Sequence, residues 1–282
     1  MTDQAGRTEM TYKSLDSQTT RGGRLEVVEY GILAGSSDAR TAEKLFFLRE
    51  SGMKLKSVKI TLNKGRARLE PGALYHMSGE LEMVASTGGG IGSALKRKIT
   101  TGESLLVNEV KGTGEIFLEP TYGHFILAEL NDDEIIVDNE MFYAAIGDLN
   151  ITSIMQRSLS AGFMGNDGWF QTKISGTGIV ALFSPVPQFE LQKIELNNSM
   201  VAVDGNFAIM RSGDIKFTVQ KSSKSWLATS ASGEGLLNFY KGTGTVWLAP
   251  TQGVYEKLST PEGLDILSRA TGSRGSHVNQ KK

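Results

Sequence analysis

The sequence predicts an all-β protein with a few short helices, because it contains a triplicated unit and is rich in glycine. A Gly-Thr-Gly tripeptide occurs at 112–114, 176–178 and 242–244, each time before a short β-type run. A second marker glycine keeps nearly the same period, at positions 79, 147 and 213. Units of about 65 residues are each too small to bury a core alone, so three copies are expected to share one interface.

The repeats also predict how the chain is divided. Glycine outnumbers proline by 33 to 6, which indicates many tight turns within the repeated body. The two ends are polar and lack periodicity, which is typical of disordered segments. The predicted divisions are a disordered leader at 1–23, a strand-helix-strand segment at 24–72, repeats at 73–137, 138–202 and 203–256, and a short helix with a disordered tail at 257–282.

Composition excludes several classes of protein. A net charge of -1 gives no global field that would attract a polyanion. Without cysteine the chain has no disulfide framework, no thiolate metal site and no thiol nucleophile. The N-terminus lacks the apolar segment of a secretory signal, and no stretch is apolar enough for a transmembrane helix. We therefore expect a cytoplasmic protein.

The best helix signal in the chain lies at 38–49. Asp38 can cap the first turn, and Gly52 is placed to end the helix. Apolar residues cover one side, which favours a helix lying across a sheet over a helix that binds a partner. Its apolar residues are Ala42, Leu45, Phe46 and Leu48.

The next segment, 54–62, alternates polar and apolar residues with the period of a half-buried strand. Lys54, Lys56 and Lys59 lie on its polar side. Lysines on a strand usually occupy a solvated face or guard an exposed edge. We favour that interpretation over a nucleic-acid patch, because the strand lacks the interleaved aromatic residues of a stacking platform.

No motif in the chain predicts catalysis. The glycine-rich segment 87–92 fails the spacing of the dinucleotide fingerprint and of the Walker loop, so a flexible turn is favoured over a phosphate cradle. His76, His124 and His277 lie far apart without the spacing of a metal motif. No Gly-x-Ser-x-Gly elbow occurs. We therefore predict no catalytic residue, no metal ligand and no cofactor.

Basic side chains provide the weak site prediction that remains. Lys96, Arg97 and Lys98 form the densest basic cluster of the folded body, and a solvated turn competes with contact to a phosphate or a partner. Lys111 and Lys241 each precede a Gly-Thr-Gly tripeptide and could add to such contacts. The marker glycines are predicted to be structural, with room for a bulge or a close backbone approach. They are Gly79, Gly112, Gly114, Gly147, Gly176, Gly178, Gly213, Gly242 and Gly244.

Four segments, at 69–79, 88–97, 101–105 and 112–116, occur in the order of a known family. Over roughly 53–255 the chain resembles proteins that are like the tryptophan RNA-binding attenuation protein (TRAP-like) and related to mitochondrial biogenesis factors of the AIM type. The resemblance implies a double-stranded β-helix or sandwich unit, repeated three times in a pseudo-threefold arrangement. Bacterial members lack an assigned activity, and mitochondrial members are linked to inner-membrane organisation. The RNA-binding relative uses a ring of basic loops, whereas Ser175 here replaces one of the three lysines.

These observations predict a non-enzymatic β-scaffold that binds a macromolecular partner, most simply a protein, through loops at one end of the repeated body. Nucleic-acid binding through a local basic patch is the first alternative. Peripheral membrane association, suggested by the family resemblance, is the second.

Overall fold

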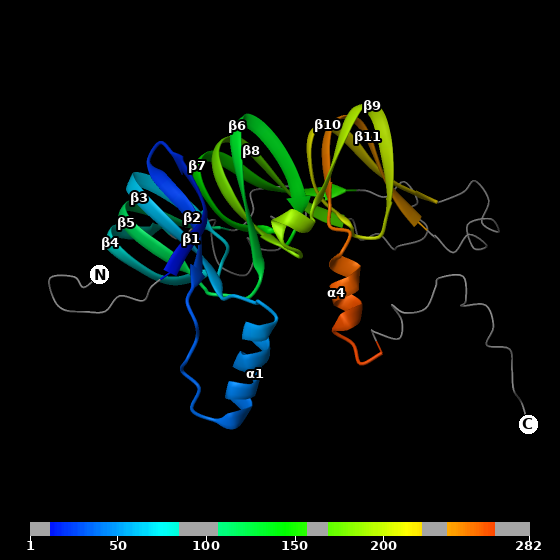
Figure 1. The fold of residues 1–282 in the computed structure, drawn as a ribbon. Coiled ribbons are helices and arrows are strands. Elements are labelled where there is room, and N and C mark those ends of the chain that lie inside the picture. The colour runs from blue at the N-terminus through cyan, green and yellow to red at the C-terminus, as the bar shows by residue number, and fades with distance from the viewer. Residues whose placement is uncertain (1–11, 85–106, 157–168, 222–235, 263–282) are drawn as a thin grey trace, which may run out of the picture.

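Antiparallel pairing links every strand of the computed structural model, which describes residues 12–84, 107–156, 169–221 and 236–262. Within these ranges the strands form one 11-stranded sheet in the order β1-β2-β3-β7-β8-β6-β10-β11-β9, and β5 carries β4 on the far side of β3. Two short α-helices extend from the same side of the sheet (Figure 1). The predicted all-β body with a few short helices is thus confirmed.

The described part of the chain consists mostly of long strands. The strands are β1 (Tyr12–Thr20), β2 (Gly23–Tyr30), β3 (Lys56–Leu69), β4 (Leu74–Val84), β5 (Asn108–Leu118), β6 (His124–Asp138), β7 (Phe142–Gln156), β8 (Trp169–Ser184), β9 (Gln192–Asp204), β10 (Ala208–Lys221) and β11 (Leu236–Leu248). The helices are α1 (Ala39–Glu50), the 3-10 turn η1 (Gln188–Glu190) and α4 (Gln252–Leu258).

Three strand triplets repeat one pairing scheme along this sheet. In each of β3–β5, β6–β8 and β9–β11, the third strand lies between the first and the second. Pairing of β3 with β7 and of β6 with β10 joins the triplets. The predicted repeat boundaries fall near the end of the first strand of each triplet. Each predicted repeat therefore begins one strand later than the triplet that the pairing defines. A pseudo-threefold arrangement of the triplets about an axis stays a prediction.

Neighbouring triplets share their hydrophobic core. Ile60 and Leu118 of the first triplet lie in one cluster with Ile146 and Ile179 of the second. A second cluster joins residues of β6–β8 to Ile209 at the start of β10. This sharing is what units too small for a separate core require.

A bulge lies opposite each Gly-Thr-Gly tripeptide. The first strand of each triplet has one residue with positive φ, and its backbone N–H donates to the threonine hydroxyl of the tripeptide. The three bonds are Lys64 to Thr113 (2.9 Å), Asp132 to Thr177 (3.0 Å) and Asn198 to Thr243 (3.0 Å). All three tripeptides lie in mid-strand, in β5, β8 and β11, with paired residues on both sides. The marker glycines of β4, β7 and β10 face them across the ladder.

The threonine bond supports a direct prediction. Replacing Thr177 by valine keeps the volume and removes the acceptor for the Asp132 N–H. We expect urea unfolding to show a loss of about 1 kcal/mol, the ordinary net contribution of such a bond. Thr177→Ser is the matched control because it keeps the hydroxyl. Equal losses for serine and valine would contradict a role for the hydrogen bond.

Residues 12–20 correct the predicted disordered leader, because they form β1 and pair with β2. Tyr12 at the start of β1 packs edge-on against Phe117 and accepts a 2.9 Å hydrogen bond from Lys59 Nζ. An isolated strand carries little signal of its own in a polar sequence, and here the partner strand stabilises it.

The prediction that Lys59 lies on a solvated face or guards an exposed edge is also wrong. It is only 9% exposed, and β3 is an interior strand between β2 and β5, so it does not guard an edge. Its ammonium lies over the rings of Tyr12 and Phe117 and pairs with Glu115 at 2.5 Å. Burial disfavours the charge, but the bonds from Glu115 and Tyr12 outweigh it and the pKa of Lys59 is raised.

Candidate binding groove

Helix α1 has the bounds that its caps predict but not the predicted position. Asp38 Oδ1 accepts from the Thr41 N–H at 2.9 Å, and Gly52 ends the helix with φ +74°. However, no residue of α1 is buried, so the helix does not lie across the sheet. Figure 1 shows it projecting from the end of the sheet.

The exposed apolar residues of α1 lack the packing that normally stabilises a short helix. Phe46 and Phe47 are 57% and 62% exposed, with their rings edge to face at 5.5 Å. A helix of about 12 residues is marginal in water without tertiary packing. Adjacent exposed aromatic rings on such a helix are typical of a surface that binds something.

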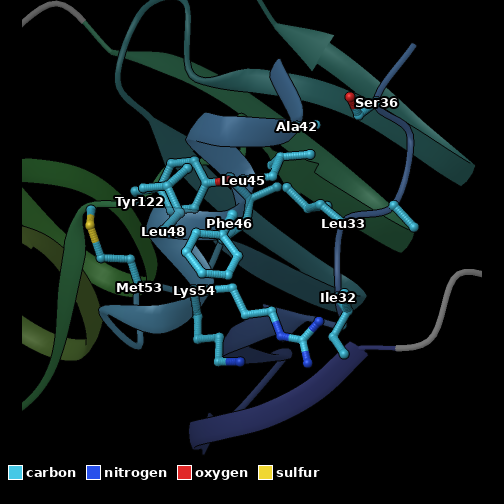
Figure 2. A pocket seen from close by; sticks show the side chains of 14 residues that line it. Ile32, Leu33, Ser36, Ala42, Leu45, Phe46, Leu48, Met53, Lys54 and Tyr122 are labelled. Atoms are coloured by element: carbon cyan, nitrogen blue, oxygen red, sulfur yellow. The ribbon is translucent and has the colours of Figure 1, made fainter. Parts of the chain in front are cut away.

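A groove of about 280 Å³ separates α1 from the extended segment 31–36 that precedes it. Figure 2 shows the apolar side chains that line it. Its main lining residues are Ile32, Leu33, Ala42, Leu45, Phe46, Leu48, Met53, Leu55 and Tyr122. Two charged residues, Arg49 and Lys54, complete the lining, and both are cationic. The groove therefore combines an apolar floor with a positive rim.

The sheet holds the Tyr122 side of the groove in place. Lys56 and Thr121 exchange both backbone hydrogen bonds at 2.8 Å, which ties the start of β3 to the connection between β5 and β6. Lys56 Nζ donates to the Gly123 carbonyl at 2.9 Å, and its partial burial lowers its pKa. Burial, followed by the nearby Lys56 charge, also lowers the pKa of His124. One wall of the groove is thus fixed, whereas the α1 wall has few contacts.

Of the predicted basic residues, the structure describes Lys111 and Lys241, and these two do not lie at one site. Lys96, Arg97 and Lys98 lie outside the described residues. Lys111 of β5 pairs with Glu109 at 2.7 Å, and Lys241 of β11 is an exposed residue opposite Lys216. These two lysines occupy equivalent positions, but five strands separate β5 from β11 in the sheet order.

Lys111 instead contributes to a basic cleft that the sequence alone did not reveal. Four cationic residues line this cleft of about 740 Å³ and outnumber its two carboxylates, Glu80 and Asp148; they are Arg21, Lys64, Arg66 and Lys111. Burial opposes ionisation of the nearby Glu109, but the Lys111 bond and the charges of Arg66, Lys111 and Arg68 outweigh it and lower its pKa. These residues meet because β2, β3 and β5 are paired, which sequence spacing does not show.

The equivalent edge of the second triplet carries the opposite charge. Asp132, Asp133 and Glu134 line the corresponding cleft, in which Arg68 is the cationic residue. Lys173 pairs with Glu134 at 2.5 Å on the same edge. The sign of the charge therefore alternates between neighbouring triplets, and a continuous phosphate track along this edge is not formed.

Histidine and carboxylate groups do not assemble into a metal centre in the part of the chain that the structure describes. His76 of β4 stacks on Phe117 with ring centroids 4.8 Å apart. His277 lies outside the described ranges.

With this geometry established, comparison with known proteins places the chain. The family described as mitochondrial biogenesis AIM24 matches residues 48–251. The chain belongs to the AIM24 family. This confirms the AIM part of the predicted resemblance, while the TRAP-like part stays a prediction. The AIM24 match begins within α1, so segment 31–36 lies before it.

A crystal structure of a Streptococcus pyogenes protein shares the AIM24 chain's fold. It has a TM-score of 0.53 and 20% sequence identity over 70% of this chain and 88% of the other. Identity at that level indicates a common fold and carries no information on activity. No curated protein matches the chain. Among its described helices, none is long and apolar enough to cross a membrane.

Proposed function

We propose that this AIM24-family protein is a non-enzymatic β-scaffold of the cytoplasm that binds a protein partner through the groove beside α1. The observation that carries the proposal is a helix with no buried residue and with two adjacent exposed phenylalanines. The sheet supplies a rigid frame, and functional segments of such frames are commonly the projecting ones. The predicted pseudo-threefold arrangement would keep this frame rigid.

The lining of the groove defines the chemistry of the partner. An apolar channel of this kind suits the apolar stripe of an amphipathic helix, whose side chains enter at helical spacing. Arg49 and Lys54 at the rim favour acidic residues beside that stripe. The concave groove supports a protein helix, whereas the protruding rings of Phe46 and Phe47 are the feature that a lipid surface would bind instead.

Nucleic-acid binding has less support. The cationic cleft of the first triplet lies next to the acidic edge of the second. A bound polyanion would meet repulsion within one triplet of its contact.

A photo-crosslinking experiment tests the groove directly. A benzophenone amino acid placed at Phe46 is expected to crosslink a defined protein from nuclease-treated cytosol. The same group at Phe189, which is 87% exposed on η1, is the control and should not crosslink that protein. Crosslinking of the same proteins from both positions would contradict a specific groove, and flotation of the protein with anionic liposomes would favour the membrane alternative.

An affinity measurement with the captured partner completes the test. Leu45→Asp places a charge in the apolar lining. We expect the dissociation constant to rise at least tenfold, which is equivalent to about 1.4 kcal/mol of binding free energy. Leu258→Asp on α4 is the matched control at an exposed helical leucine outside the groove. Equal affinities for the two variants would place the interface elsewhere.

A further inference from the structure

A second cavity, of about 470 Å³, lies where the second and third triplets meet. Its lining comes from segments far apart in the chain: the end of β6, the start of β8, the β9–β10 turn, the start of β11 and α4. Asp138, Gln171, Asn238, Tyr240 and Gln252 bring polar groups into this space. The aromatic residues Phe170 and Phe217 complete the wall. Convergent polar groups in a partly aromatic cavity are typical of small-molecule sites.

A buried hydrogen-bonded chain supports one wall. Arg211, which is 4% exposed, donates through Nη1 to Gln171 Oε1 at 2.8 Å. Gln171 Nε2 in turn donates to Asp138 Oδ1 at 3.3 Å. The guanidinium also lies over the rings of Phe217 and Tyr240. Its charge balances that of Asp138 across the glutamine, whereas Glu140, which also lines the cavity, adds a second carboxylate.

Several polar atoms at the cavity lack partners among the described residues. Gln252 Oε1 is buried without a hydrogen bond. Tyr240 is 3% exposed, and its hydroxyl has no hydrogen bond to any residue of the described ranges. The second oxygen of Asp138 also has no hydrogen bond to any residue of the described ranges. Of these three atoms, Gln252 Oε1 is the one that is fully buried without a partner, and the other two keep contact with solvent and are accessible to a ligand in the cavity.

The fold itself does not require these polar residues. Tyr240 lies two residues before its Gly-Thr-Gly tripeptide, and the equivalent residues of the other triplets are Val110 and Ile174, both fully buried. An aliphatic side chain at this position therefore satisfies the packing of the triplet. The third triplet carries a phenol there, beside a buried guanidinium, at a desolvation cost that a purely structural role does not explain.

We propose that this cavity binds a neutral polyhydroxylated ligand of the sugar or cyclitol class. Hydroxyl groups can donate to the free oxygens of Asp138 and Gln252 and accept from the Tyr240 hydroxyl, which satisfies all three atoms with one kind of group. The Phe170 ring offers an apolar face to the C–H side of such a ring. A cationic ligand would pair with Asp138 and Glu140 and is the competing class, which an amine probe distinguishes.

Saturation-transfer NMR on the full chain tests the proposal with D-glucose, D-galactose, D-mannose and myo-inositol at millimolar concentration. At least one of these probes is expected to receive saturation from the wild-type protein. Tyr240→Phe should weaken its binding at least tenfold. Tyr143→Phe is the matched control, because the Tyr143 hydroxyl donates to the Glu119 carbonyl at the other triplet junction. Its binding should equal that of the wild type.

Three results would overturn the proposal: no probe binds, an amine such as ethanolamine binds while the hydroxylated probes do not, or Tyr240→Phe binds like the wild type. Thermal melting establishes that each variant is folded. If Tyr240→Phe does not fold, Asp138→Asn tests the same cavity, again with an expected loss of at least tenfold.

Discussion

Replacing Gly176 by alanine is expected to lower the free energy of unfolding by about 3 kcal/mol or more. Gly176 has φ +118°, which an alanine adopts only with strain. An added Cβ would also lie 2.4 Å from the Asp148 carbonyl oxygen on the paired strand. The clash is between two backbones in the middle of a ladder, so neither can move without breaking the pairing of β7 with β8.

Two control glycines separate the contributions to this loss. Gly72 has φ +90° with nothing within 4 Å of an added Cβ, so Gly72→Ala reports the conformational strain alone. Gly35 has neither a positive φ nor a neighbour, and Gly35→Ala should change stability by less than about 0.5 kcal/mol. Urea unfolding of the three variants is the measurement. If Gly176→Ala and Gly72→Ala lose equal stability, the close backbone approach is not what requires the glycine.

Stability is expected to fall between pH 4 and pH 8 because of Asp138, by about 3 kcal/mol for this group. Burial raises the pKa of Asp138 from 3.8 to about 6, against the opposing effects of the Gln171 bond and the Arg211 charge. A carboxyl whose pKa is higher in the folded state binds its proton more tightly there. The stabilisation by that proton is complete below about pH 4 and is lost as the pH rises through 6.

The test compares wild type and Asp138→Asn by urea unfolding at several pH values. The asparagine does not titrate, so the stability of the variant relative to wild type should rise by about 3 kcal/mol from pH 4 to pH 8. Asp204→Asn, at an exposed carboxylate, is the control and should follow the wild-type curve. Parallel curves for wild type and Asp138→Asn would show that the carboxyl is solvated in the folded protein.

Spacing along the chain was enough to predict the predominantly β body. The Gly-Thr-Gly period reflects a bulge that each triplet must form, and only glycine tolerates the carbonyl contact found at Gly112, Gly176 and Gly242. The caps of α1 were equally visible, since Asp38 and Gly52 act within one turn of the helix. Caps and glycine positions of this kind depend on residues that are close together in the sequence, so the sequence alone can predict them.

Features that depend on pairing between distant segments could not be predicted. The burial of Lys59 depends on Tyr12 and Glu115, which β1 and β5 bring from opposite directions. The cavity around Asp138 and Tyr240 needs β6 and β10 to pair across a triplet junction. Single-sequence patterns report which face of an element is apolar, but not which element covers it.

Residue types and periods thus determined that this AIM24-family chain is a predominantly β protein with one strong helix, because turn, cap and bulge geometry are local. Tertiary structure decided that the helix stands away from the sheet, and which charges lie in each cleft. It also decided where polar atoms are buried without partners. Those properties arise from contacts between segments tens of residues apart, whose free energy depends on the whole sheet.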